Sequence, residues 1–423
     1  MSKKCGNKAT HMKETDPCMP PEPVAYADRS TEDSSLESPI TWFQDMITHA
    51  LDYATGEKEK GRGIVGILCE YTPRELIMAA NAIPVCLCGG SAEMISPAEE
   101  FLPANLCPLI KSTYGYSVQQ ANPFLEMADL VVAEATCDGK KKMYELLGQR
   151  YPMVVLELPQ KPEDSDALHH WIRELEKLKV ELETRFQVTI TDEGLRESIK
   201  AMNKERKLRR KLAELMKDEK PPLTGHELLD MKSLISCIPS DLAQYEKALE
   251  KLPGRMLSPP VESNVRVLLT GVPLPHGAER VMEIIETNGG LVVCQENCTG
   301  LKPILEDIRE DADNPLQALA EKYFHLPCSV MTKNERRLES LRSLVREYKP
   351  HCVIELIWQA CITYDVESFF VRKLIEEELG LSYLRIETDY SPSDTARIAL
   401  RVQALFETIK GKKEFAAGYY PKK

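Results

Sequence analysis

The hydrophobic pattern of the chain alternates between short apolar runs and amphipathic stretches in two separate parts of the sequence. The apolar runs have the length and composition of buried strands: Ile64–Cys69, Ile83–Cys88, Leu130–Ala133 and Tyr151–Leu158 in the first part, and Asn264–Thr270, Leu291–Cys294, Cys352–Trp358 and Tyr383–Glu387 in the second. Segments with apolar residues at helical spacing follow most of these runs. Strands that alternate with helices in this way predict an α/β fold built on parallel sheets.

The segment between the two parts has a different pattern. Narrow apolar faces among charged residues predict amphipathic helices over Leu168–Phe186, Asp192–Lys217 and Leu242–Leu252, and prolines, including Pro239, interrupt them. The run Lys204–Lys211 is basic, which is typical of a solvated helix face; docking of an acidic partner protein is the alternative.

These patterns predict two similar parallel-sheet domains, flavodoxin-like or Rossmann-like, with an inserted helical region. We expect a disordered tail over residues 1–38, which are rich in Pro, Ser, Thr, Asp and Glu. An N-terminal α/β domain is expected over 39–160, beginning with a helix over Pro39–Glu59. A helical region and linker are expected over 161–262, and a C-terminal α/β domain over 263–423.

The composition narrows the classes of protein to consider. The chain has 423 residues and a net charge of −12, and it has no basic stripe, so we expect no nucleic-acid partner. It has no apolar run long enough to span a membrane and no apolar signal core, so we expect a cytoplasmic protein without a membrane partner. Thirteen cysteines in such a chain favour free or metal-binding thiols over disulfides.

Cys137 lies between an expected strand and an expected helix. Thr136 and Asp138 on either side are good N-cap residues, so the thiol should lie at a helix N-terminus, where a thiolate is favoured. Lys140–Lys142 in the same helix suggest either a solvated first turn or a site for phosphate or coenzyme A. A second helix start is expected at Thr72-Pro-Arg-Glu75, with Thr72 as its cap.

The two α/β parts can be aligned with one another as an internal duplication. In this alignment the strand before Cys88 matches the strand before Cys298, Cys107 matches Cys328, and Cys137 matches Cys361. Each part thus offers three cysteine-bearing loops at one edge of a parallel sheet, which is where such sheets bind ligands. The only close pairs are Cys86-x-Cys88 and Cys294-x3-Cys298, and neither has the matching second pair of a zinc module, so three thiols from separate loops in each part favour iron–sulfur clusters.

At these cysteines the sequence resembles the 2-hydroxyacyl-CoA dehydratase and benzoyl-CoA reductase family over roughly residues 40–420. The segments that carry the resemblance are Gly66–Leu76, Cys107–Ser112, Thr136–Glu145, Glu296–Pro303, Tyr323–Cys328, Trp358–Cys361, Ile386–Tyr390 and Arg401–Glu407. Because the chain has more cysteines at these positions than one 4Fe-4S cubane needs, it most resembles the double-cubane cluster proteins of that family.

This resemblance implies an 8Fe-9S double-cubane cluster, two 4Fe-4S units bridged by sulfide, held by six cysteines. The expected ligands are Cys69, Cys107, Cys137, Cys298, Cys328 and Cys361, with Cys88 or Cys294 as the alternative to Cys69. It also implies a homodimer, a separate ATP-hydrolysing 4Fe-4S reductase that supplies low-potential electrons, and the reduction of small unsaturated molecules such as acetylene. The chain itself has no P-loop motif for ATP.

Glu296 and His276 are the expected proton donors, since both lie beside expected ligand loops and catalytic acids belong near the reacting centre. Two other functions remain open from the sequence. One is a 2-hydroxyacyl-CoA dehydratase or benzoyl-CoA reductase subunit with a single 4Fe-4S cluster. The other is an electron carrier or cluster scaffold without substrate turnover.

Overall fold

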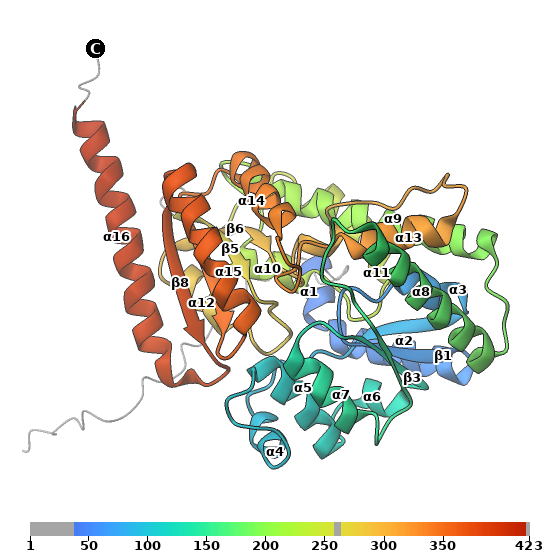
Figure 1. Ribbon diagram of the computed structural model, residues 1–423. Helices are drawn as coiled ribbons and strands as arrows, with labels where there is room; N and C mark the ends of the chain where they lie inside the picture. Colours follow the sequence, from blue (N-terminus) through green and yellow to red (C-terminus); the bar gives the residue numbers. More distant parts are fainter. Residues whose placement is uncertain (1–37, 258–263, 420–423) are drawn as a thin grey trace, which may run out of the picture. The chain divides into compact units, whose positions relative to one another are not determined.

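Two four-stranded sheets form the framework of the computed structural model, which describes residues 38–257 and 264–419, with side chains up to residue 411 (Figure 1). Residues 1–37 of the expected tail lie outside this range. The first sheet contains β1 (Gly63–Ile67), β2 (Ala82–Cys86), β3 (Leu130–Glu134) and β4 (Met153–Leu156). The second contains β5 (Val265–Gly271), β6 (Gly290–Glu296), β7 (Cys352–Trp358) and β8 (Ser382–Thr388).

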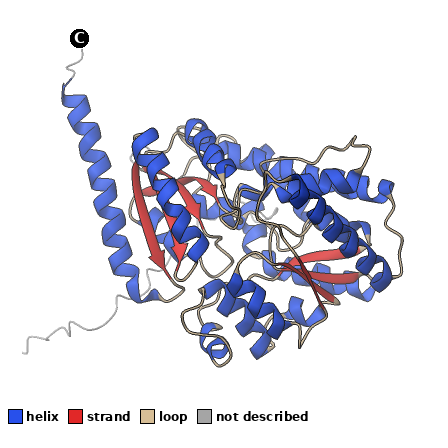
Figure 2. Cartoon of the chain, viewed as in Figure 1, coloured by secondary structure: helices blue, strands red, loops and turns tan. Residues whose placement is uncertain are grey.

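The two sheets have the same topology. The strand order is β2-β1-β3-β4 in the first and β6-β5-β7-β8 in the second, and all pairings are parallel. Helices surround both sheets (Figure 2). The predicted α/β class, with two Rossmann-like sheets, is therefore confirmed, and so is the correspondence of the first four expected strands with the last four.

The helices of the first part of the chain are α1 (Pro39–Gln44), which packs in the core of the second sheet through Phe43, and α2 (Met46–Glu59), α3 (Arg74–Ala79), α4 (Ile95–Glu99), α5 (Pro108–Gln119), α6 (Pro123–Met127) and α7 (Asp138–Leu147). The inserted region contains α8 (Ser165–Phe186), α9 (Asp192–Glu214), α10 (Gly225–Asp230) and α11 (Pro239–Lys251). The second sheet is accompanied by α12 (Arg280–Thr287), α14 (Glu335–Tyr348), α15 (Ile362–Lys373) and α16 (Thr395–Tyr419), whereas α13 (Pro315–Phe324) packs with α8 in the core of the first sheet.

The strands are mainly apolar because both faces of each sheet are covered, with charged residues such as Glu134 and Glu296 at their carboxyl ends. On β3, Leu130 and Val132 pack in a core with the helices of the inserted region, while Val131 and Ala133 pack on the other side with α6 and α7. On the second sheet, α16 covers one face with Ile398, Val402, Phe406 and Ile409, which recur at helical spacing and are buried.

The inserted helices are part of this packing and are not a separate solvated layer. Helix α9 packs on α3, and α8 packs on α13. Arg206 on α9 is 2% exposed and forms a buried ion pair with Glu75 on α3. The interpretation of Lys204–Lys211 as a solvated face is therefore wrong for Arg206 and correct for Lys204 and Lys207, which are exposed.

Several predicted helix starts are wrong in detail. Thr72 does not cap α3, because Pro73 occupies the N-cap position and the Thr72 hydroxyl donates to the buried carboxylate of Glu134 instead. Cys137 itself, rather than Thr136 or Asp138, is the N-cap of α7. Pro239 begins α11 instead of interrupting a helix, since a proline is tolerated at the first helical position.

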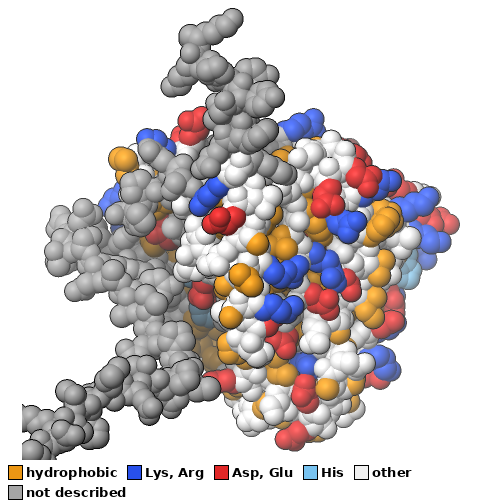
Figure 3. Space-filling model, turned by 90° about the vertical axis from the view of Figure 1, so that its left-hand side faces the viewer, with side chains coloured by type: hydrophobic (Ala, Val, Ile, Leu, Met, Phe, Trp, Pro, Cys, Tyr) orange, Lys and Arg blue, Asp and Glu red, His pale blue; other side chains and the backbone are white. Residues whose placement is uncertain are grey.

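Charged side chains are mixed in sign on the face at the left of Figure 1, which Figure 3 views directly. Lys and Arg alternate there with Asp and Glu and with single apolar residues. Among residues 38–257 and 264–419, no helix is both long and apolar enough to cross a membrane.

Candidate functional site

The carboxyl ends of the strands of both sheets border one cavity of about 490 Å³. Eight cysteines line it: Cys69, Cys86, Cys88, Cys107, Cys137, Cys298, Cys328 and Cys361. All six of the expected ligands are among them, together with the alternative Cys88. Cys294, the other alternative, is 1% exposed within β6 and lies against a separate cavity of about 30 Å³.

Three of these thiols lie at the N-termini of helices. Cys107 is the N-cap of α5, Cys137 of α7 and Cys361 of α15, and each of these helices has at least ten residues. The unpaired backbone N–H groups and the dipole at such an end favour negative charge on sulfur. These three positions therefore suit thiolates, which is the form that binds iron.

The same three thiols are neighbours. The Cys361 thiol donates a hydrogen bond to Cys107 and thereby lowers the pKa of Cys107. Burial raises the pKa of Cys137, and the nearby thiols of Cys361 and Cys328 add to the increase. Cys107, Cys137 and Cys361 thus form a first thiol group, which joins two loops of the first sheet to one loop of the second.

Cys69, Cys298 and Cys328 form a second thiol group. Burial raises the pKa of Cys69, and Cys328 and Cys298 contribute further. Burial and the same three sulfurs raise the pKa of the Tyr71 hydroxyl. Each group therefore combines both halves of the chain, whereas the duplication alone suggested one group of three in each half.

Cys88 lies in the cavity wall beside these groups. Its thiol donates to the carbonyl of Leu68 at 3.6 Å. Burial raises its pKa to about 11, and the charged or polar neighbours that act on it most are Lys140 and Cys86, not the thiols of either group. This position makes Cys69 the better partner of Cys298 and Cys328.

The position of Lys140 near the thiols was not predicted from the sequence. This residue lines the cavity, donates to the carbonyl of Leu68 at 2.7 Å and lies near the thiols of Cys69, Cys88 and Cys137. The interpretation of Lys140–Lys142 as a solvated turn is therefore wrong for Lys140. It is correct for Lys141 and Lys142, which pair with Asp138 and Glu145 on the exposed side of α7.

The two expected proton donors lie in different surroundings. His276 lines the cavity with its side chain 56% exposed, and its Nδ1 lies 3.6 Å from Glu279. Glu296 is fully buried at the end of β6, 3.2 Å from Lys302 and 3.3 Å from Arg337, and it does not line the cavity. The role of either residue as an acid stays a prediction.

A further set of cavity residues comes from distant helices and was also missed. It consists of cationic side chains, which we call the basic wall: Arg74, Arg206, Arg209, Lys232 and Lys322. They come from α3, α9, the segment after α10, and α13. The only signal in the sequence was the basic run on α9, whose buried face could not be distinguished from its exposed face.

The donor set fits a cluster better than a single ion. Within the described part of the chain, no three or more Cys, His, Asp or Glu residues converge as the ligands of one metal ion. An iron–sulfur cluster distributes its thiolate ligands over several irons, so thiols spaced around a wide cavity suit it. Soft sulfur donors without histidines among them also favour iron–sulfur clusters over ions that prefer oxygen.

Comparison with known proteins adds independent information. The model of the family described as 2-hydroxyglutaryl-CoA dehydratase, D-component, matches residues 69–409. The putative dehydratase subunit YjiM of Escherichia coli (strain K12) is 38% identical over 362 residues, which cover 83% of this chain and 93% of that protein. The (R)-phenyllactyl-CoA dehydratase beta subunit of Clostridium sporogenes is 23% identical over 87% of this chain and 97% of its own length. A benzoyl-CoA reductase subunit of Thauera aromatica is 24% identical over 67% of this chain and 73% of its own length.

Proposed function

Because this chain belongs to the 2-hydroxyglutaryl-CoA dehydratase D-component family, we propose that it is an iron–sulfur reductase whose cysteine-lined cavity holds an 8Fe-9S double-cubane cluster. The cluster receives low-potential electrons from a separate ATP-hydrolysing 4Fe-4S reductase. Its substrate is a small unsaturated molecule of the acetylene type.

The observation that carries this proposal is the division of six cavity thiols into two groups of three. Cys107, Cys137 and Cys361 are neighbours, and a second set of three lies beside them in the same cavity. A single cubane uses at most four protein thiolates. Two groups of three thiols that adjoin each other are what two linked cubanes require.

The chain's own residues prepare this cavity for a strongly negative group. The N-termini of α5, α7 and α15 stabilise thiolates, and Lys140 adds a positive charge among the sulfurs. When bound, the cluster supplies electrons to the substrate. His276 at the cavity wall can hold a proton for the reduced product, since its ring is accessible to solvent and paired with Glu279.

ATP hydrolysis is assigned to a separate protein on the family resemblance, which agrees with the lack of a P-loop motif in this chain.

A homodimer is supported by an exposed apolar stripe on α15. Four residues spaced along one face of this helix are 53–73% exposed: Ile362, Val366, Phe369 and Phe370. Contiguous exposed apolar residues of this size mark protein interfaces.

A second candidate function is a 2-hydroxyacyl-CoA dehydratase or benzoyl-CoA reductase subunit with a single 4Fe-4S cluster. The names of the relatives from Clostridium sporogenes and Thauera aromatica favour it. In this case only one of the two thiol groups would hold iron, and the chain would bind an acyl-CoA or a related partner subunit.

Iron and acid-labile sulfide in anaerobically purified protein separate the two candidates. We expect about eight irons per chain for two cubanes and about four for one. Acetylene reduction that requires both ATP and the 4Fe-4S reductase tests the activity. Four irons per chain together with acyl-CoA binding would replace the first candidate by the second.

A further inference from the structure

Three lysines that line the cavity have no carboxylate partner within the described residues. Lys140 donates to the carbonyl of Leu68, Lys232 to that of Leu274 at 3.2 Å, and Lys322 to that of Pro303 at 3.0 Å. No ion pair within 4.0 Å involves any of them in the part of the chain that the structure describes. Lys322 is buried, and Lys140 and Lys232 are half-buried. An ammonium group that is removed from water without a counter-ion is costly, so each charge needs an explanation.

Lys140 already has one, because it lies among the sulfurs of the proposed cluster. Lys232 and Lys322 belong to the basic wall and do not. Burial, together with the neighbouring Arg206, lowers the pKa of Lys322 to about 7. Burial also lowers the pKa of Lys232 to about 8, and Arg209 acts in the same direction.

The carboxylates near Lys232 and Lys322 form hydrogen bonds or ion pairs with other groups, including two arginines of the basic wall. Glu70 forms two hydrogen bonds with Arg74, at 2.8 and 3.0 Å, and Glu75 pairs with Arg206. Glu205 accepts from the backbone N–H of Cys237 at 2.6 Å, and its carboxylate is 3.5 Å from Arg209, at the outer limit of a hydrogen bond.

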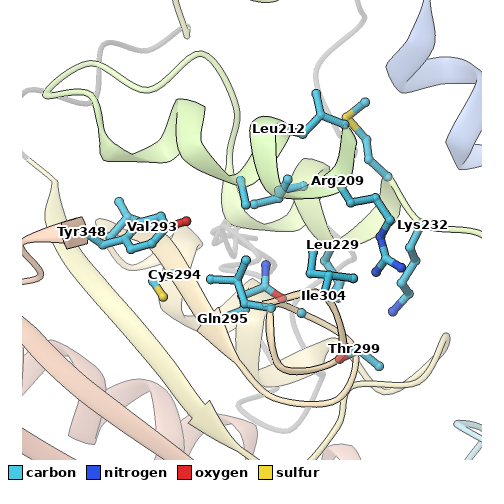
Figure 4. A pocket seen from close by; sticks show the side chains of 15 residues that line it. Arg209, Leu212, Leu229, Lys232, Val293, Cys294, Gln295, Thr299, Ile304 and Tyr348 are labelled. Atoms are coloured by element: carbon cyan, nitrogen blue, oxygen red, sulfur yellow. The ribbon is translucent and has the colours of Figure 1, made fainter. Parts of the chain in front are cut away.

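Arg209 and Lys232 are two adjacent cations with little compensation, since among the described residues Arg209 has only the 3.5 Å contact with Glu205 and Lys232 only the carbonyl of Leu274. Figure 4 shows their charged ends side by side, beyond the apolar residues of the smaller cavity. Both also line the cysteine-lined cavity, so they stand where the two cavities meet. The carboxylates of Glu279 and Asp230 lie more than 4.0 Å from Lys232, and they pair with His276 and His226.

We propose that Arg209 and Lys232 form a subsite for a small oxyanion, a carboxylate or a phosphate, on the wall of the cysteine-lined cavity. Two adjacent cations, one a planar guanidinium and the other an ammonium, suit an oxyanion with two or three equivalent oxygens. This subsite rests on the proposed function, because it gives the chemical class of the ligand that binds near the cluster. The substrate, or a molecule bound beside it, carries a carboxylate or phosphate group. The subsite does not depend on the number of irons.

The test is a calorimetric titration of anaerobically purified, cluster-containing protein with inorganic phosphate and, separately, with succinate, at constant ionic strength. We expect saturable binding of at least one of them. Lys232→Met should weaken it about tenfold or more, because charged hydrogen bonds to an anion are lost. Lys232→Arg keeps the charge and should retain binding, and Met at this position removes an uncompensated charge, so the variant should fold.

Lys207→Met is the matched control, since Lys207 is exposed on the same helix as Arg209. It should bind as the unchanged protein does. Binding of phosphate alone identifies a phosphate-bearing ligand, and binding of succinate alone a carboxylate-bearing one. The subsite is refuted if protein with its full iron content binds neither anion, or if Lys232→Met binds as well as Lys207→Met does. A low iron content would instead count against the proposed cluster.

Discussion

The two sheets have the same strand order, yet their loops contribute different residues to the cavity. Cys88 and Cys298 each lie two residues beyond the end of equivalent strands, β2 and β6. Cys69 lies two residues beyond β1, but the equivalent position after β5 is Pro273. The symmetric partner of Cys298 is therefore Cys88, whereas its neighbour in space is Cys69. Equivalent positions in a duplicated fold need not act together, because the two halves face each other across the cavity.

The halves also differ in the partners of the buried carboxyl groups near their strand ends. In the first, the Thr72 hydroxyl is the one side chain among the described residues that donates a hydrogen bond to Glu134, and burial raises the pKa of Glu134 to about 7. In the second, Arg337 lies 3.3 Å from Glu296 and 3.0 Å from Glu355. Burial opposes the charge of Glu296, but Lys302 and Arg337 hold its pKa below the ordinary value. The first half thus keeps a carboxyl close to neutral, and the second pairs its carboxylates with cations.

The largest effect should come from the cysteine that breaks the symmetry. Cys69→Ser should remove one ligand of the second thiol group, so we expect about half of the iron and all of the reductase activity to be lost. Cys88→Ser, the symmetric counterpart of Cys298, should keep both. Iron analysis and the electron paramagnetic resonance spectrum of the reduced protein measure this. The reverse pattern would mean that the duplication, not proximity, selects the ligands.

The second effect concerns the ion network of the second half. Arg337→Leu leaves the buried carboxylate of Glu355 without a cation and that of Glu296 with Lys302 alone, and it should lower the free energy of unfolding by about 3–5 kcal/mol. Glu134→Gln in the first half should change it by less than about 1 kcal/mol near pH 7, because that carboxyl is already partly protonated. Urea unfolding of both variants checks the contrast. Equal losses would show that the two halves do not differ in this respect.

The third effect belongs to the apolar stripe on α15, in the second half. Phe369→Glu should weaken the proposed homodimer by about 2 kcal/mol, roughly 30-fold in Kd, because a Phe side chain no longer becomes buried. Sedimentation over a range of concentrations measures the change. Val180→Glu alters a similarly exposed residue on α8 and should leave the dimer intact. A chain that is monomeric before any substitution would refute the interface.

The smallest effect concerns how the inserted helices attach to each half. Helix α9 is joined to the first by Arg206 and Glu75, while α10 is joined to the second by Glu286, which accepts from the backbone of Gly225 at 2.7 Å and of His226 at 3.2 Å. The hydrogen bond to Asp230 raises the pKa of His226 to about 9.

Because the pKa of His226 is raised in the folded protein, its charged contact with Asp230 stabilises the fold. This stabilisation is complete below the ordinary histidine pKa of about 6.5 and disappears as the pH rises through about 9. His226→Gln should therefore destabilise the protein at about pH 6 by less than about 1 kcal/mol, since the ring is partly exposed, and should not do so at about pH 9.5. Urea unfolding at the two pH values measures this. A loss of equal size at both would mean that the charge of His226 is not its cause.

Much of the fold could be predicted because its signals are local. The eight strands are short apolar runs between helices, and each was found within a few residues of its place. Helices α13 and α14 were not anticipated, and the helix expected over 39–59 is broken at Asp45. The starts of α3 and α7 were assigned to the wrong residues; at α3 the reason is that Thr72 is used in a tertiary contact with Glu134, which no local pattern reveals.

The sequence by itself determined the order of the elements, the duplication and the placement of the cysteines in loops at strand ends. These follow from periodicity and from the rule that parallel strands end at one edge. Only the tertiary structure decided which thiols are neighbours, that Lys140 points among them, and that α9 delivers Arg206 and Arg209 to the cavity. The physical reason is that a loop's position in the chain fixes the sheet edge at which it lies, whereas its neighbours across the cavity depend on how two separate sheets pack together.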